Sequence, residues 1–208
     1  MIVVSTSRND FSAVLRGRPV IAILRGMDLS VALDVAHRVW DRGIGVVEVP
    51  VQDEASFETF QAVRLRGLDR GEPVGVGTVT RLELLERVID AGADFTVAPG
   101  FDLAVVEASA EAGVPHLPGV GTATEVQKAL LAGCDHVKAF PASSLSPSWF
   151  REMRGPFPAA TFIATGGIDT SNVKDFLAAG AAAVGIGSAL RSQRAADALF
   201  DLVETIDD

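Results

Sequence analysis

Short runs of β-branched and other apolar residues recur along the chain, and this repetition most constrains the fold. Successive runs begin roughly 20 to 27 residues apart, the length of one strand, one helix and two short loops. Between them lie segments with apolar residues at helical spacing, such as Leu82, Leu85, Val88 and Ile89. The predicted strands are 20–24, 46–51, 74–79, 95–98, 114–117, 136–140, 161–164 and 182–186.

The ends of the predicted helices carry their own signals. Ala-Gly pairs at 91–92, 112–113, 132–133 and 179–180 suit helix ends, because glycine readily adopts the left-handed conformation found there. Thr80 with Glu83, and Thr122 with Glu125, fit the capping-box pattern and predict two helix starts.

Eight such units in 208 residues predict a (β/α)8 TIM barrel, with residues 1–208 as a single domain. The alternative, an open doubly wound sheet, usually has fewer strands at this length and a point where the strand order reverses. Residues 9–15 predict an extra short N-terminal helix, with Phe11, Val14 and Leu15 able to plug one end of the barrel.

Composition excludes several functional classes. The net charge of −9 argues against nucleic acid as a partner, because no net positive field would attract phosphates. No run of about 18 apolar residues predicts a membrane span, and residues 1–10 lack the order of a signal peptide. The single cysteine, Cys134, fits a reducing compartment. We therefore expect a cytoplasmic protein.

Lys138 interrupts the apolar strand Val-Lys-Ala-Phe-Pro at 137–141. A lysine there either reaches water, pairs with a carboxylate, or loses its charge through desolvation. A desolvated, neutral lysine is the nucleophile that imine formation with a ketone requires.

Glu48 lies in the strand Val-Val-Glu-Val-Pro-Val at 46–51. Strand alternation places Val46, Glu48 and Pro50 on one face, which we expect to be the barrel interior. A buried carboxylate suits proton transfer, although a structural ion pair with Lys138 or Arg25 is the alternative.

Two strands end in glycine-rich sequences, which are also common in ordinary turns. Thr165-Gly166-Gly167 follows one strand and Gly187-Ser188 follows the next. In barrel enzymes the loops after strands seven and eight often bind phosphate through backbone N–H groups. Together they predict a phosphate site.

Thr78 and Arg25 also end predicted strands and are candidates for binding an anionic group. His37, His116 and His136 have no metal-site spacing, so we expect structural roles and no metal site.

The motifs Ile-Leu-Arg-Gly, Val-Glu-Val-Pro-Val, Gly-Val-Gly-Thr-Val, Val-Lys-Ala-Phe-Pro-Ala and Thr-Gly-Gly-Ile occur in this order between about residues 19 and 190. The series resembles the 2-keto-3-deoxy-6-phosphogluconate (KDPG) aldolase family. The resemblance implies a class I aldolase without metal or cofactor, assembled as a homotrimer. Its reaction would cleave a 2-keto-3-deoxy-6-phospho sugar acid to pyruvate and glyceraldehyde 3-phosphate.

The resemblance also implies roles for individual residues. Lys138 matches the Schiff-base lysine and Glu48 the glutamate that moves protons. Thr78 matches a threonine that holds the pyruvyl carboxylate, and Pro99 and Phe140 match residues lining the pyruvyl pocket. The phosphate cradle corresponds to Gly166, Gly167 and Ser188, and the residue near the sugar hydroxyls corresponds to Thr165.

One position departs from the gluconate-type enzymes, because Gln52 stands where they carry a carboxylate-binding arginine. An amide there, with Ile-Leu-Arg-Gly on the first strand, resembles the 6-phosphogalactonate branch, and Arg25 could replace the missing arginine. Thr165 instead resembles the gluconate type. Three alternatives remain: a 4-hydroxy-2-oxoglutarate-type aldolase, a phosphate-binding barrel isomerase or synthase without an imine, and an inactive sugar-phosphate binder.

Overall fold

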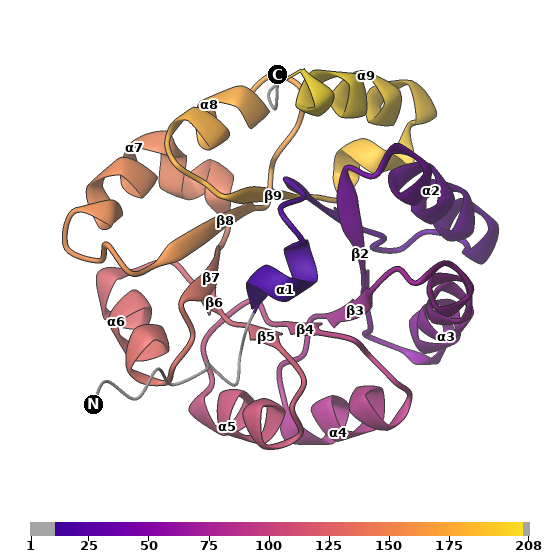
Figure 1. The fold of residues 1–208 in the computed structure, drawn as a ribbon, viewed down its shortest axis with the longest axis horizontal. Helices are drawn as coiled ribbons and strands as arrows, with labels where there is room; N and C mark the ends of the chain where they lie inside the picture. Colours follow the sequence, from indigo (N-terminus) through magenta and orange to yellow (C-terminus); the bar gives the residue numbers. More distant parts are fainter. Residues whose placement is uncertain (1–10, 206–208) are drawn as a thin grey trace.

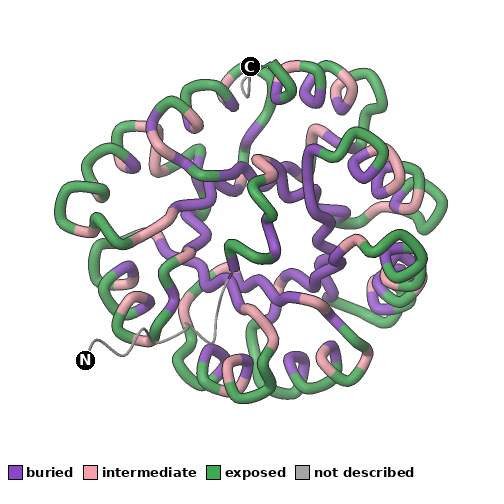
Figure 2. Tube along the Cα trace, in the orientation of Figure 1, coloured by how far each residue is buried: buried purple, intermediate pink, exposed green. Residues whose placement is uncertain are grey.

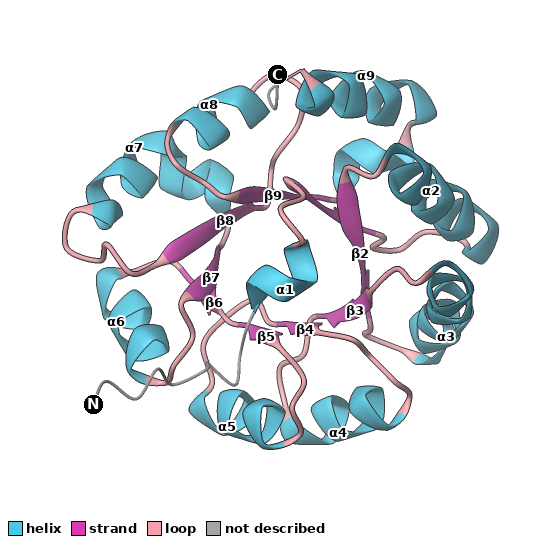
Figure 3. Ribbon diagram, viewed as in Figure 1, coloured by secondary structure: helices cyan, strands magenta, loops and turns pink. Residues whose placement is uncertain are grey.

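A computed structural model describes residues 11–205, in which parallel strands form a ring surrounded by helices (Figures 1 and 3). The strands are β1 (Val20–Ile23), β2 (Gly45–Pro50), β3 (Val74–Gly77), β4 (Thr96–Val97), β5 (His116–Leu117), β6 (Gly119–Val120), β7 (His136–Ala139), β8 (Thr161–Thr165) and β9 (Ala183–Ile186). The helices are α1 (Phe11–Leu15), α2 (Leu29–Arg42), α3 (Glu54–Arg70), α4 (Leu82–Asp90), α5 (Leu103–Glu111), α6 (Ala123–Leu131), α7 (Ala142–Arg154), α8 (Val173–Ala178), the 3-10 helix η1 (Ser188–Arg191) and α9 (Gln193–Glu204).

The strand order is β5-β4-β3-β2-β1-β9-β8-β7-β6, with every pair parallel. Only Pro118 separates β5 from β6 in the chain, so the two ends of this order meet and complete a (β/α)8 TIM barrel. The fifth strand, predicted as one run at 114–117, is therefore two short segments. Pro118 has no N–H to donate to a ladder, but its carbonyl accepts a hydrogen bond from the Lys138 backbone N–H (2.9 Å).

The predicted helix ends are mostly confirmed. Gly92, Gly113, Gly133 and Gly180 all have positive φ after their helices, and Thr122 and Glu125 form the expected capping box. The prediction at Thr80 was wrong: α4 begins at Leu82, and its N-cap, Arg81, makes no side-chain capping bond. Glu83 is then the second helical residue rather than the third, so the reciprocal bonds of a capping box cannot form.

The strands bury both faces, and helices cover the outer one (Figure 2). Val47 and Val49 of β2 belong to the outer cluster that packs against the helices. Val46 belongs instead to the inner cluster, which fills the barrel. This split confirms the predicted alternation along β2.

The short helix α1 lies across one end of the barrel (Figure 1). Phe11 is fully buried among the inner residues, and its ring lies 5.5 Å from that of Phe95, centroid to centroid. Phe95 immediately precedes β4, so α1 closes the amino end of the strands. The predicted plug at one end of the barrel is thus confirmed, while Asn9 and Asp10 of the predicted helix lie outside the described residues. The carboxyl ends of the strands are left uncovered by α1.

Across residues 11–205, none of the helices combines the length and apolar character that crossing a membrane requires.

Candidate active site

Strand alternation brings Glu48 and Lys138 into the interior of the barrel. On β7, Val137 and Ala139 face the helices, so Lys138 between them faces inward. On β8, Ala164 faces the helices and Ile163 faces the interior, so Thr165 also points inward. Polar groups from β2, β7 and β8 thus lie inside the barrel. They are near the carboxyl ends of their strands, where the active sites of barrel enzymes lie.

The Lys138 side chain is almost completely buried, with 4 % of its surface exposed. Burial lowers the pKa of Lys138 below its ordinary value; the negative charge of Glu48 opposes this shift and the positive charge of Arg25 adds to it. Its Nζ also lies 5.3 Å from the centroid of the Phe140 ring. Desolvation, the largest of these effects, shifts Lys138 toward the neutral amine, which is the nucleophilic form of a lysine, whereas the Glu48 charge and the face of the aromatic ring favour the ammonium.

Glu48 is 1 % exposed, and its Oε1 has no hydrogen-bond partner among the described residues. Burying a carboxylate oxygen without a hydrogen-bond partner costs free energy of folding. A side chain with a purely structural role would therefore be expected to have such a partner. The neighbouring strand makes room for it: a Cβ added to Gly77 would lie 1.8 Å from Oε1. Glycine at 77 therefore lets the carboxylate occupy the barrel interior.

Arg25, Gln52 and Thr78 form a hydrogen-bonded group at the ends of β1, β2 and β3. The Arg25 guanidinium donates to Gln52 Oε1 (3.0 Å) and to Thr78 Oγ1 (3.1 Å). Thr78 has φ +66°, a left-handed conformation that a β-branched residue rarely adopts. Strain of this kind is often retained where function requires it. Because Thr78 Oγ1 accepts from Arg25, its own O–H can donate to a ligand.

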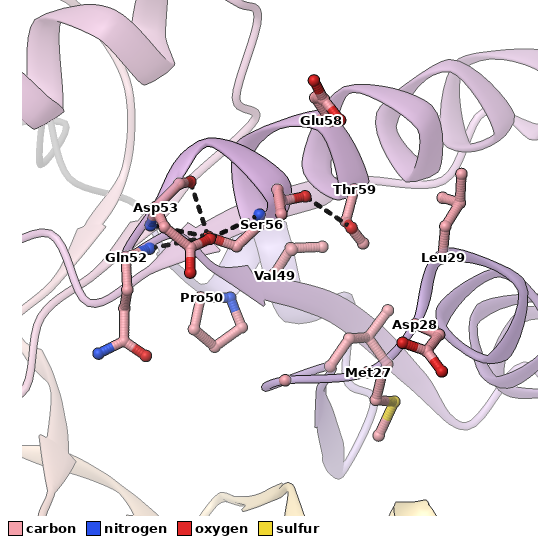
Figure 4. Close-up of a pocket in the computed structure, with 13 residues that line it drawn as sticks. Met27, Asp28, Leu29, Val49, Pro50, Gln52, Asp53, Ser56, Glu58 and Thr59 are labelled. Carbon is pink, nitrogen blue, oxygen red and sulfur yellow. Dashed lines mark hydrogen bonds between the residues drawn. The ribbon is translucent and has the colours of Figure 1, made fainter.

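The start of α3 fixes the backbone at Gln52. Asp53 and Ser56 form a capping box, and Ser56 Oγ also accepts from the Gln52 N–H (3.0 Å). Figure 4 shows the Gln52 side chain pointing away from this cap. These residues border a cavity of about 450 Å³ between the loops after β1 and β2, whose other walls include Met27 and Glu58. Lys138 is not among its lining residues.

A separate cavity of about 260 Å³ adjoins Lys138. Most of the predicted catalytic and substrate-binding residues line it: Arg25, Lys138, Phe140, Thr165, Gly166, Gly167, Gly187 and Ser188. Gly166 and Gly167 have φ of +97° and +72°, and a Cβ at Gly167 would lie 2.5 Å from Ser143 Oγ. These positions need glycine both for their conformation and for the close approach of neighbouring groups.

Most of the predicted site residues line this cavity, but Glu48, Gln52, Thr78 and Pro99 do not. Gln52 and Thr78 are joined to it through their hydrogen bonds with Arg25, which does line it. Pro99 is half-buried after β4, with its carbonyl against Gly119, and does not line the cavity beside Lys138. Arg191, which the sequence did not single out, does line it. The only sequence signal was a basic residue shortly after the last glycine-rich strand end.

Comparisons with known proteins identify the family to which the chain belongs. A family model described as KDPG and KHG aldolase matches residues 11–203. A probable 2-dehydro-3-deoxy-6-phosphogalactonate aldolase of Rhizobium meliloti (strain 1021) is 34% identical over 174 residues, 83% of this chain and 82% of the relative.

Two solved structures share the fold over most of their length. A native KDPGal structure superposes with a TM-score of 0.82 at 29% identity, covering 90% of this chain and 95% of the other. KDPG aldolase from Legionella pneumophila, with pyruvate captured at low pH as a covalent carbinolamine, gives a TM-score of 0.78 at 28% identity, covering 91% and 94%. The chain therefore belongs to the KDPG and KHG aldolase family and is an aldolase.

Proposed function

We propose that this aldolase forms an imine between Lys138 and the ketone of a 2-keto-3-deoxy-6-phospho sugar acid, which it cleaves to pyruvate and glyceraldehyde 3-phosphate. The observation that carries the proposal is the buried pair inside the barrel. Burial favours neutral Lys138, and Glu48 presents a carboxylate oxygen that has no partner among residues 11–205.

The steps use these two side chains. Lys138 Nζ attacks C2 to give a carbinolamine. Glu48 relays a proton from solvent to the carbinolamine hydroxyl, which leaves as water and gives a protonated imine. Glu48 takes the proton of the C4 hydroxyl as the C3–C4 bond breaks, and the bonding electrons pass to C3 to give an enamine and the aldehyde. Glu48 then returns the proton to C3. Water hydrolyses the resulting imine, which releases pyruvate and restores the lysine.

The cavity and the Arg25 group at its edge offer separate anchors for the two charged ends of such a substrate. The Arg25 guanidinium and the Thr78 hydroxyl can bind the carboxylate. The backbone N–H groups around Gly166, Gly167, Gly187 and Ser188 can bind the phosphate. The ketone would lie between these ends, beside Lys138.

The names of the relatives support this class of substrate, but they name more than one substrate within it. The Rhizobium meliloti relative is named for the galactonate epimer and the Legionella pneumophila structure for the gluconate epimer. The matching family also includes KHG aldolases, and Gln52 keeps a 4-hydroxy-2-oxoglutarate substrate as a second candidate. Family membership favours all of these over the isomerase, the synthase and the inactive binder.

A cleavage assay tests the proposal and separates the candidates. The purified protein is mixed with the gluconate epimer, the galactonate epimer or 4-hydroxy-2-oxoglutarate, and pyruvate is measured with lactate dehydrogenase. We expect the greatest kcat/KM with a phosphorylated epimer. Faster cleavage of 4-hydroxy-2-oxoglutarate would favour the second candidate, and no pyruvate from any substrate would contradict the proposal. The homotrimer and the cytoplasmic location stay predictions.

A further inference from the structure

Arg191 ends η1, directly after the last strand of the barrel, and has no role in the chemistry described above. It lines the cavity beside Lys138 together with Gly167 and Ser188. These two residues belong to the loops that follow β8 and β9. Arg191 therefore brings a guanidinium to the end of the cavity where the phosphate is expected.

Arg191 lacks the ion pair that many other arginines form in the part of the chain that the structure describes. Many arginines of this acidic chain form ion pairs with carboxylates: Arg18, Arg38, Arg42, Arg64, Arg66, Arg70, Arg81 and Arg87. Within residues 11–205, Arg191 forms none, and no acidic residue lines the cavity beside Lys138. Asp34 lines a second cavity that Arg191 also borders, but the two side chains form no ion pair. An unpaired guanidinium beside a cavity without carboxylates is suited to an anionic ligand.

Two contacts hold the Arg191 side chain beside the first loop of the barrel. Its Nη2 donates to the backbone carbonyl of Arg25 (3.1 Å). The same nitrogen would lie 3.1 Å from a Cβ added to Gly26, so the guanidinium packs closely on the Gly26 backbone. One N–H thus anchors the group, and the remaining donors of the planar fork are available to a ligand.

We propose that Arg191 binds the phosphate of the substrate and gives the enzyme its preference for phosphorylated over unphosphorylated aldehydes. The proposal rests on the proposed function and adds a side-chain donor to a cradle made mainly of backbone N–H groups. Because Arg191 is also anchored to the carbonyl of Arg25, phosphate binding would steady the loop that carries the carboxylate-binding guanidinium.

The experiment compares Arg191→Gln with the wild type in the direction of synthesis. Pyruvate is combined with glyceraldehyde 3-phosphate or with glyceraldehyde, and the ratio of the two kcat/KM values is determined. Loss of a charge-assisted hydrogen bond to phosphate should lower this ratio about tenfold or more. Arg194→Gln is the matched control, because Arg194 is exposed and lies outside the cavity. Arg191→Lys keeps the charge and should restore part of the ratio.

Two results would overturn the proposal. An equal loss of kcat/KM with both aldehydes would show that Arg191 only holds the Arg25 loop, and an unchanged ratio would show that it does not reach the phosphate.

A binding measurement keeps this test separate from that of the proposed function. Inorganic phosphate is titrated into wild type and Arg191→Gln by calorimetry. Should the wild type catalyse no reaction, about tenfold or more weaker phosphate binding by the variant would still support the role of Arg191. Equal phosphate binding by the two proteins would refute it.

Discussion

His116 gives the barrel a pH dependence that can be worked out from its surroundings. It lies on β5 and faces the helices, because its neighbour Leu117 faces the interior. It is 1 % exposed, and its Nδ1 lies 2.8 Å from Thr96 Oγ1. Burial lowers the pKa of His116 from 6.5 to about 4, with the charge of Asp102 opposing the shift.

The sign of the effect follows from proton binding. Between pH 6.5 and about 4 the unfolded chain binds a proton at His116 that the folded chain does not bind. The free energy of unfolding therefore has its full value above pH 6.5 and decreases as the pH falls toward 4. The full pKa difference corresponds to about 3 kcal/mol, most of which would be lost by pH 4.5.

The assay is urea unfolding at several pH values from 7.5 to 4.5, for wild type and His116→Asn. The amide can still hydrogen-bond near Thr96 but does not titrate. We expect the wild type to lose about 2 to 3 kcal/mol more than the variant over this range. His37→Asn, in which His116 is unchanged, should keep the wild-type slope. Equal slopes for wild type and His116→Asn would refute the reasoning.

Two further predictions concern the interior of the barrel. Glu48→Gln keeps the shape of the side chain but removes the proton acceptor, so kcat should fall about 100-fold or more while the thermal midpoint is kept; a near-normal kcat would remove Glu48 from the proton transfers. In Gly77→Ala the new methyl group would overlap the Glu48 carboxylate, so we expect about 1 to 3 kcal/mol of destabilisation and a loss of kcat. Gly100→Ala is its control, because no atom lies within 4 Å of the added Cβ, and equal behaviour of the two variants would contradict the packing argument.

Local patterns predicted the barrel because strand alternation and helix ends depend on neighbouring residues. Val46 and Glu48 could be assigned to the inner face from the period of two in their strand, and the structure agrees, because Val46 belongs to the inner cluster while Val47 and Val49 belong to the outer one. The break at Pro118 was missed, because the apolar run at 114–117 suggested a single strand. Its position is decided by pairing on two sides, with β4 and with β7.

The rest of the site depends on contacts between distant segments. Arg191 reaches the cavity only because η1 turns back toward the loop after β1, a contact that spans 166 residues of the chain. The positive φ of Thr78 is likewise a property of the fold, since its sequence reads as an ordinary strand residue. Pro99 was predicted to line the pyruvyl pocket because it matches a family residue, yet it does not line the cavity beside Lys138.

Borohydride reduction in the presence of pyruvate is the most direct test of the central claim. The protein is incubated with pyruvate, reduced, digested and analysed by mass spectrometry, with Lys138→Ala as the comparison and exposed Lys128 as an internal control. The account predicts a reduced pyruvyl adduct on Lys138, none on Lys128, and none in the variant. A folded wild-type protein that yields no adduct on Lys138 with pyruvate in excess would contradict the imine mechanism.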